Sequence, residues 1–516
     1  MKSVLIAVLS ITLLLSWLGF LTLLERPFQS QEQETEKGDT DEIVVWLNEM
    51  LGTPDEAYYY ELQDCWNVTH SNVKMKLAVM SHAGYDSKLR VAIASGQPPD
   101  VCTSGFETLQ ALESSGKSLD LAAPIPEDIL PVEQLKAMGP VVERSALRNG
   151  KPYVFPLYRY CYGGVMLANR TMLMEAGYDD DEIRRNGWTF DQFRDACKRM
   201  TKDLDGDGKT DIWGYASALS HMEHLLLNEF GPAIYGKEIA TAQFLGYDEQ
   251  TKRWTRHPGL TEDHFYQLCL LYHQLINVDK SWNPNYLSMT TYELLDEIIT
   301  QQKLGMMFGS IPWAPKVYKD IWDLEVKQGV KKPNPFPDLT TFWTPTLRKG
   351  DWPSPSAGVY GLSVLKQTPY KGDTHTRNAC RVALFLTHPV HLARSQMRFF
   401  RHLPPEPERF GKIFPELIDM NDRWVKYYNE VMESGHWHTL GVDSATAPDF
   451  TAYQAVNMEV INWLRKTGYG VMEQVIYQKI TPEEGGRRLF VGIKEAADKT
   501  YEKLGLTPQV TPGASE

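Results

Sequence analysis

Short apolar runs alternate with segments of helical spacing along this chain, and this alternation restricts the fold more than any other feature. Residues 43–45 (IVV) form a run typical of a buried strand. Residues 86–94 (DSKLRVAIA) have apolar positions at helical spacing and stop at a Ser-Gly pair before two prolines. Further strand-like runs lie at residues 100–102, 153–156 and 164–167. Strands that alternate with helices predict an α/β fold.

The chain is long, acidic and rich in apolar residues. Its 516 residues, 42% of them hydrophobic, exceed one ordinary domain, so we expect two lobes. The formal net charge is -13 and no block of Lys and Arg occurs, so we expect no nucleic-acid partner. Aromatic rings can stack on the flat faces of sugars, and the chain has 14 Trp and 25 Tyr, although most such rings serve as core residues.

The first 25 residues form a hydrophobic segment. Residues 4–24 carry no charge and end at Glu25. The segment has no small-x-small cleavage site before Glu25 and no cysteine, so we expect an uncleaved membrane anchor, with a signal peptide as the alternative. Residues 26–42 are polar and predict a tether. We therefore expect the remaining chain to lie outside the cytoplasm, in the periplasm or at the cell surface.

Two helices are marked by the residues at their starts. In residues 188–200, Thr189 and Gln192 have the spacing of a capping box. A second such pattern, with proline at the first helical position, lies at residues 481–484 and begins a closing surface helix. The last segment, residues 507–516, is polar and rich in proline, which predicts a flexible tail.

The sequence contains no motif of a common catalytic centre and none of a zinc or thioredoxin-like site. Its six cysteines are scattered, without a CxxC pair or a Cys/His cluster. It also lacks a nucleophile elbow, HExxH, a phosphate loop and a dinucleotide fingerprint. We therefore expect a protein that is not an enzyme and requires no cofactor. A pair of glycoside-cleaving carboxylates among its 66 acidic residues leaves an extracellular carbohydrate-active enzyme as an alternative.

Many segments occur in an order that is typical of one protein family. Between Ile43 and Leu504 the chain contains, in order, IVVWLNE, LRVAIASGQPPDV, NGKPYVFPLYRYCYGGVMLANRTMLMEAG, WTFDQF, DLDGDGKTDIWGYA, KLGMMFGSIPW, SAGVYGLSVL, FLTHP and LPP. In this order it resembles the family 1 extracellular solute-binding proteins, the group that includes the maltose- and maltodextrin-binding proteins.

The resemblance implies a periplasmic-binding-protein-like type II fold, in which two α/β lobes are joined by a hinge and close on a ligand in the cleft between them. It places lobe 1 at residues 42–156 plus 358–402, and lobe 2 at residues 157–357 plus 403–506. It implies a monomer that binds a sugar or oligosaccharide and presents it to the permease subunits of an ABC importer. Another solute, such as a glycerophosphodiester, a peptide or an acidic sugar, is the alternative.

The chain departs from the family pattern at several places. Ala168-Asn169 stands where the family usually has Tyr-Asn, and Cys102-Thr103-Ser104 replaces an aromatic that often follows the Pro-Asp strand. The chain also has extra length around residues 215–300 and 400–450. These departures affect the expected ligand more than the expected fold.

Candidate ligand-binding residues lie at the ends of the predicted strands. Trp46 and Asn48 end the first strand and can stack on a ligand and hydrogen-bond it, although Trp46 suits the lobe core almost as well. Ser104 follows the strand that begins at Asp100 and offers a hydroxyl group. Asp100 itself can serve as the cap of the preceding turn.

Further candidates lie on the segments that the resemblance assigns to the hinge and the cleft. Trp313 lies where family members present an aromatic ring to the ligand. Tyr158, Arg159 and Tyr160 follow a strand near one crossover, so at least one of them should face the cleft. Arg159 can bind sugar hydroxyls or the carboxylate of an acidic sugar. Tyr360, on the other crossover, can contact the ligand or pack in the hinge.

One loop has the pattern of a calcium site. Asp203, Asp205, Asp207 and Asp211, with the carbonyl of Lys209, match positions of an EF-hand-type loop. The Glu expected at its last position is replaced by glycine. Dense carboxylates repel one another without a cation, but an exposed loop can tolerate them in water. The sequence thus predicts either a structural Ca²⁺ site or a solvated acidic loop.

Overall fold

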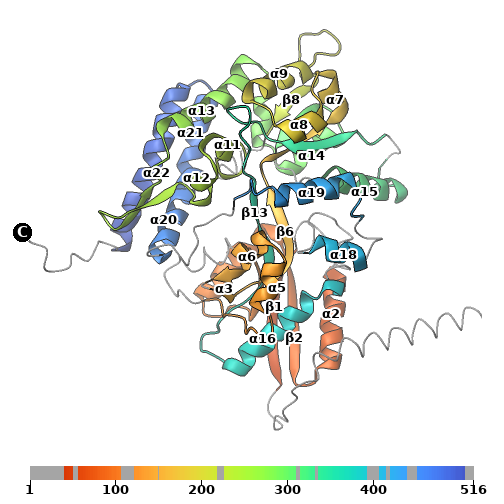
Figure 1. Ribbon diagram of the computed structural model, residues 1–516, viewed down its shortest axis with the longest axis vertical. Coiled ribbons are helices and arrows are strands. Elements are labelled where there is room, and N and C mark those ends of the chain that lie inside the picture. Colours follow the sequence, from red (N-terminus) through yellow and green to blue (C-terminus); the bar gives the residue numbers. More distant parts are fainter. Residues whose placement is uncertain are drawn as a thin grey trace, which may run out of the picture.

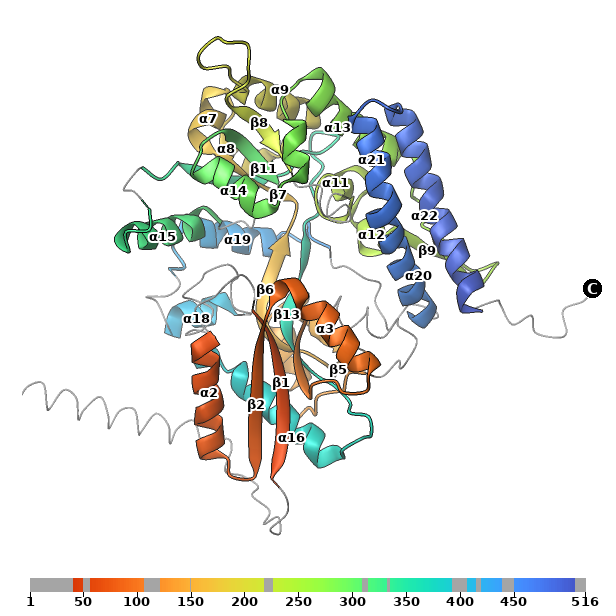
Figure 2. The same cartoon turned by 180° about the vertical axis from the view of Figure 1, so that it is seen from behind.

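The computed structural model describes residues 40–49, 56–105, 121–148, 150–217, 226–308, 314–331, 335–391, 406–413, 419–438 and 450–505. Over these residues the chain forms two α/β regions, each built on one sheet (Figure 1). Strands β6 (Phe155–Tyr162) and β13 (Ser356–Val364) run from the first region towards the second, as Figure 2 shows from behind.

The first region is built on a five-stranded sheet with the strand order β2-β1-β3-β13-β6. The first three of these strands are parallel, and β13 runs antiparallel to both β3 and β6. Ile43, Val45 and Leu47 are buried on one face, because alternate residues of a strand share a face. The other elements of this region are β1 (Asp41–Glu49), β2 (Val73–Ser81), β3 (Val101–Gly105), β4 (Leu147–Arg148), β5 (Lys151–Pro152), α2 (Glu56–Thr69), α3 (His82–Ala94), α5 (Val132–Ala137), α6 (Pro140–Ala146) and α16 (Asp373–Leu386).

The second region is built on a four-stranded sheet with the order β12-β7-β11-β8. Three of its strands are buried along their whole length, which indicates that packing covers both faces. Its strands are β7 (Val165–Asn169), β8 (Trp213–Ala216), β11 (Leu304–Phe308) and β12 (Leu339–Trp343). The helices beside this sheet are α7 (Arg170–Glu175), α8 (Asp180–Asn186), α9 (Phe190–Met200), α14 (Thr291–Ile299) and α15 (Ala314–Lys327).

A helical layer lies next to the second sheet, where α13, α20, α21 and α22 run side by side in both views (Figures 1 and 2). The layer and the small elements around it are α11 (Gly231–Tyr235), α12 (Lys237–Thr241), β9 (Leu245–Asp248), β10 (Arg253–Arg256), α13 (Glu262–His273), η1 (Gln274–Val278), η2 (Pro284–Ser288), α20 (Phe450–Trp463), η3 (Leu464–Gly468), α21 (Tyr469–Ile476) and α22 (Pro482–Leu504). Two further helices, α18 (Pro407–Ile413) and α19 (Arg423–Glu433), follow α16 in the chain.

The predicted helix starts are confirmed. Thr189 and Gln192 form a complete capping box at the start of α9. Thr481 caps α22 by accepting from the backbone amide of Glu484, and this helix ends at Gly505, which has a left-handed backbone. The helix predicted at residues 86–94 lies within α3.

Two hydrophobic cores match the two sheets. One core combines buried residues from positions 43–165 and 343–437, and the other combines buried residues from positions 166–342 and 452–501. The chain first passes from one core to the other between Val165 and Met166, directly after Gly163 and Gly164, which both have positive φ. A Cβ on Gly163 would lie 2.2 Å from the carbonyl oxygen of Asn228, so a larger residue cannot occupy this turn without displacing its neighbour.

Several predictions about the chain ends and boundaries stay predictions. The anchor at residues 1–25, most of the tether at 26–42 and the tail at 507–516 lie outside the described residues. Within the residues that the structure describes, no helix combines the length and the apolar character needed to span a membrane. The lobe division at 42–156 plus 358–402, and 157–357 plus 403–506, is not decided by these observations.

Candidate functional site

Four neighbouring strands of the first sheet bring predicted site residues together. In the order β1-β3-β13-β6, Asn48 lies near the end of β1 and Ser104 near the end of β3. On the next two strands Tyr360 pairs with Tyr158, and Gly361 pairs with Ser104. These residues therefore form one row across the sheet, near the edge from which β6 and β13 continue towards the second region (Figure 1).

Asn48 forms hydrogen bonds to two other strands of the sheet, β3 and β13. Its Nδ2 donates to the hydroxyl oxygen of Tyr360 at 2.9 Å, although the two residues are 312 positions apart. Its backbone amide donates to Oγ1 of Thr103 at 3.1 Å. Thr103 is not among the residues predicted to bind the ligand, and its only signal in the sequence is its place beside Ser104 at a strand end. These bonds fix an amide group in position to bind a polar ligand.

Tyr158 and Tyr360 stack on each other. Their ring centroids are 5.2 Å apart and their planes differ by 8°. Tyr158 is only 7% exposed, and burial, with the nearby hydroxyl of Tyr360, raises its pKa well above the usual range. Its hydroxyl group is therefore neutral at physiological pH and can both donate and accept a hydrogen bond.

Tyr160 lies against the backbone of the neighbouring strand. It pairs with Gly358 across β6 and β13, and a Cβ on Gly358 would lie 2.4 Å from the Tyr160 hydroxyl oxygen. Glycine is thus required at this position for the ring to take its place. Tyr158, Tyr160 and Tyr360 share one face of the two strands, since alternate residues point the same way.

Arg159 points to the opposite face of β6 from Tyr158. Its strand partner Val359 is buried in the first core. The Arg159 carbonyl oxygen accepts from the Tyr428 hydroxyl of α19 at 3.0 Å, so this helix covers the outer edge of β6. The Arg159 Nε is buried and has no hydrogen-bond acceptor among the described residues.

The remaining predicted ligand residues lie elsewhere or outside the described part of the chain. Trp46 is half-buried and packs against a small core that contains Tyr85, Leu89 and Cys102. Trp313 lies outside the described residues, as does the side chain of Ser104. The structure therefore brings Asn48, Tyr158, Tyr160 and Tyr360 together, and it leaves the roles of the other candidates as predictions.

A comparison with protein families identifies the chain. The family model described as "Bacterial extracellular solute-binding protein" matches residues 52–386, which is more than half of the sequence. The chain belongs to this family. Members of the family are binding proteins rather than enzymes, and they act outside the cytoplasm. The predictions of a binding protein and of an extracytoplasmic location are thereby confirmed.

Solved structures of other solute-binding proteins have the same fold. A maltose/maltodextrin-binding domain from Bdellovibrio bacteriovorus has a TM-score of 0.58 and 16% identity, over 88% of this chain and 99% of that one. The GacH receptor of Streptomyces glaucescens has a TM-score of 0.58 and 15% identity, over 89% of this chain and 99% of that one. A substrate-binding protein from Listeria monocytogenes has a TM-score of 0.56 and 16% identity, over 90% and 100%. No curated protein sequence matches.

These similarities confirm the predicted two-lobed α/β fold of this solute-binding protein. The site described above lies where β6 and β13 leave the first sheet, so both strands belong to the connection between the regions (Figure 2). Its described side chains are phenols and an amide. Such groups recognise hydroxyl-rich or amide-rich ligands by stacking and hydrogen bonding, without covalent chemistry.

The aspartate-rich loop of this solute-binding protein brings three carboxylates together. Asp203, Asp205 and Asp211 each offer one oxygen, and these oxygens lie within 4.8 Å of one another. Backbone amides of the loop donate to Asp203 and hold its pKa below the usual range. Asp207 instead pairs with Lys209, at 2.8 Å between Oδ2 and Nζ. Carboxylate oxygens in this arrangement fit a hard cation such as Ca²⁺.

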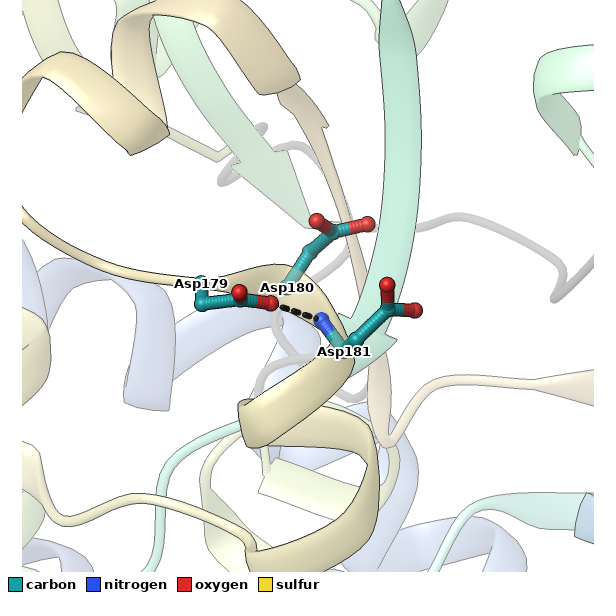
Figure 3. Close-up of side chains that lie close together, drawn as sticks. All are labelled: Asp179, Asp180 and Asp181. Carbon is teal, nitrogen blue, oxygen red and sulfur yellow. Dashed lines mark hydrogen bonds between the residues drawn. The ribbon is translucent and has the colours of Figure 1, made fainter.

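A second group of three carboxylates lies at the start of α8 (Figure 3), and two arginines pair with two of its members. Asp180 is fully buried and pairs with Arg170 at 2.8 Å and with Arg184 at 2.9 Å. Asp179 caps the helix by accepting from the backbone amide of Asp181, the bond drawn in Figure 3, and Asp181 also pairs with Arg184. Burial opposes ionisation of Asp180, but its hydrogen bonds and the two guanidinium groups outweigh burial and lower its pKa. This group therefore needs no metal ion.

Proposed function

We propose that this solute-binding protein binds a sugar or oligosaccharide between its two α/β regions and presents it to the permease of an ABC importer. The observation that carries the proposal is the row formed by Asn48, near the end of β1, and by Tyr360 and Tyr158, within β13 and β6. Stacked phenol rings offer an apolar surface to a pyranose face, and the fixed amide and hydroxyl groups offer hydrogen bonds to its edges.

The ligands of similar proteins support the same class of solute. The similar structures include complexes with maltotriose, with acarbose and with cycloalternan, and one from Thermotoga lettingae with α-D-tagatose. They range from one sugar unit to cyclic oligosaccharides, so they favour a saccharide without fixing its size. A peptide or a glycerophosphodiester has no comparable support.

The remaining parts of the proposal concern assembly and location. We propose that the protein acts as a monomer, is tethered by its hydrophobic residues 1–25, and closes around the ligand by a hinge motion of β6 and β13. Trp313, Trp46, Ser104 and Arg159 remain proposed contributors to ligand binding. The permease would then recognise the closed form, since only that form reports a bound ligand.

Replacement of Tyr360 tests the proposed site. Tyr360→Ala removes half of the stacked pair and the partner of Asn48, so the dissociation constant should rise about 30-fold, or about 2 kcal/mol. Tyr360→Phe keeps the ring and loses only the hydroxyl, which should cost about 1 kcal/mol. Binding is measured by calorimetry on residues 40–516, after a thermal-shift screen of neutral and acidic saccharides selects the ligand.

A matched control separates binding from general damage. Tyr477 is 53% exposed, and Tyr477→Ala should leave the affinity unchanged. If Tyr360→Ala is folded and binds its saccharide as tightly as the parent protein, the proposed site is wrong. If the folded parent protein is stabilised by no saccharide but by another solute, the sugar class is wrong.

A further inference from the structure

Strand β2 lies at the edge of the first sheet, and helix α2 runs beside it in both views (Figures 1 and 2). Among the described strands, β1 alone pairs with β2, through a parallel register that extends over all nine residues of the strand. A parallel partner on one side leaves every second residue of β2 with its amide and carbonyl pointing outward. Such an edge is a template for pairing with another chain.

Side chains of α2 occupy these outward groups. Asn67 is bidentate: its Oδ1 accepts from the Met75 amide at 2.8 Å, and its Nδ2 donates to the Met75 carbonyl oxygen at 3.0 Å. One turn earlier on the helix, Gln63 Oε1 accepts from the Leu77 amide at 2.7 Å. Two residues that are four apart on the helix, Gln63 and Asn67, thus lie opposite two residues that are two apart on the strand, Leu77 and Met75. Their carboxamide groups form the hydrogen bonds that a neighbouring strand would otherwise form.

The same pattern continues towards the start of the strand. Trp66 is almost fully buried and donates from Nε1 to the Val73 carbonyl oxygen at 3.0 Å. Lys74 donates from Nζ to the carbonyl oxygens of Asn67 and His70, at the end of α2. Four consecutive outward backbone groups of β2 are therefore hydrogen-bonded: the Val73 carbonyl, the Met75 amide, the Met75 carbonyl and the Leu77 amide. The bonds from Lys74 also link the end of α2 to the strand.

We infer that α2 seals this edge against pairing with a second copy of the chain. Two copies would present the same edge to each other, and a two-fold axis would allow antiparallel pairing of β2 with β2. The carboxamides of Gln63 and Asn67 block this pairing by occupying its donors and acceptors. Lys76, whose side chain is 68% exposed and pairs with Glu42 at 3.5 Å, adds a charged side chain of the kind that disfavours pairing at a strand edge.

Removal of the carboxamides tests the inference. In Gln63→Ala/Asn67→Ala, the amides of Met75 and Leu77 should exchange hydrogen at least about tenfold faster in the monomer. The variant should also form dimers or larger species at concentrations where the parent protein is monomeric in size-exclusion chromatography with light scattering. A matched control, Asp64→Ala/Val68→Ala, changes two exposed positions of the same helix and should behave as the parent protein.

A second variant keeps the test decisive if the double variant does not fold. Asn67→Asp retains an acceptor for the Met75 amide but loses the donor to the Met75 carbonyl, so this amide should remain slow to exchange while self-association increases. A folded Gln63→Ala/Asn67→Ala protein that stays monomeric and keeps its slow amides would overturn the inference. A parent protein that is already a dimer through β2 would overturn it as well.

Discussion

Two carboxyl groups, Asp100 in the first region and Glu229 in the second, are each only 1% exposed, yet they are stabilised in different ways. Asp100 accepts from His375 Nε2 at 2.7 Å and lies 3.2 Å from Lys371 Nζ. Burial opposes its ionisation, but the bonds from His375 and the Val44 amide, together with both positive charges, outweigh burial and lower its pKa.

Glu229 has hydroxyl partners and no cation. It accepts from the hydroxyls of Tyr215 and Ser217, the latter at 2.9 Å, and among the described residues no Lys, Arg or His pairs with it. Burial raises its pKa to about 8 even though these hydrogen bonds favour the ionised form. Neutral hydrogen bonds therefore do not keep a buried carboxylate charged in this protein, whereas a nearby cation does.

The cation at Asp100 is also shared with a second carboxylate. His375 Nδ1 lies 2.6 Å from Oδ1 of Asp41, the first residue of β1. Burial lowers the pKa of His375, but its hydrogen bonds to Asp100 and Asp41 outweigh burial and raise it. A ring with an acceptor at each nitrogen must carry both protons, so the geometry requires an imidazolium ion. This ion joins the start of β1, the start of β3 and α16.

The largest effect is expected from removal of this imidazolium. His375→Ala removes the imidazolium between Asp41 and Asp100 and leaves Lys371 as the only described cation paired with either of them. The free energy of unfolding should therefore fall by about 3 kcal/mol. Lys371 is partly exposed, and Lys371→Ala should cost less than about 1 kcal/mol. Urea unfolding near pH 6 measures both. Equal costs for the two variants would show that Asp100 does not depend on a buried cation.

Glu229 gives the next largest effect, and it depends on pH. The pKa of Glu229 is about 8 in the folded protein and 4.5 in the unfolded chain. The contribution of Glu229 to the free energy of unfolding is therefore complete below pH 4.5 and is lost as the pH rises through 8. In the parent protein this loss should amount to about 2 kcal/mol between about pH 5 and pH 7. Glu229→Gln cannot ionise and should remove that part of the pH dependence.

Unfolding by urea at several pH values measures this difference. The paired control is Asp180→Asn, because Asp180 is ionised next to Arg170 and Arg184. That variant should be less stable than the parent protein at every pH above the ordinary pKa of aspartate. If Glu229→Gln shows the same pH profile as the parent protein, the buried acid is charged and the contrast with Asp100 is wrong.

Much of the fold could be predicted from local sequence patterns. The strand run at Ile43 and the capping pattern at Thr189 depend on neighbours within a few residues, and both appear in the structure. The order of segments indicated the family, and so the fold. The strand run and the capping pattern predict their elements correctly because they depend on local backbone propensity. The segment order predicts the family correctly because it depends on a long series of motifs.

The site was only partly predictable because its contacts join distant strands. From the sequence, Asn48 was expected at a strand end, Tyr158 near one crossover and Tyr360 on the other. The Asn48–Tyr360 bond exists because β13 inserts between β3 and β6. The position of Gly358 under Tyr160 depends on the register of that same pair of strands. Asp100 was predicted as a possible turn cap, and instead it binds the Val44 amide and His375 from the interior. No local pattern contains such pairings.

The smallest effect is expected at Asp203, Asp205 and Asp211, three exposed carboxylates of the loop at residues 203–211 that pair with no cation among the described residues. We propose that Asp203, Asp205 and Asp211 bind a structural Ca²⁺, and at tenfold excess over its dissociation constant the ion should stabilise the protein by about 1.4 kcal/mol. Asp203→Asn should abolish this calcium-dependent rise in melting temperature, and Asp64→Asn on α2 should preserve it. Magnesium should give a smaller rise, because it prefers to keep its water ligands. A melting temperature that does not respond to Ca²⁺ in the parent protein would show that water alone solvates this loop, as it does for most surface acids.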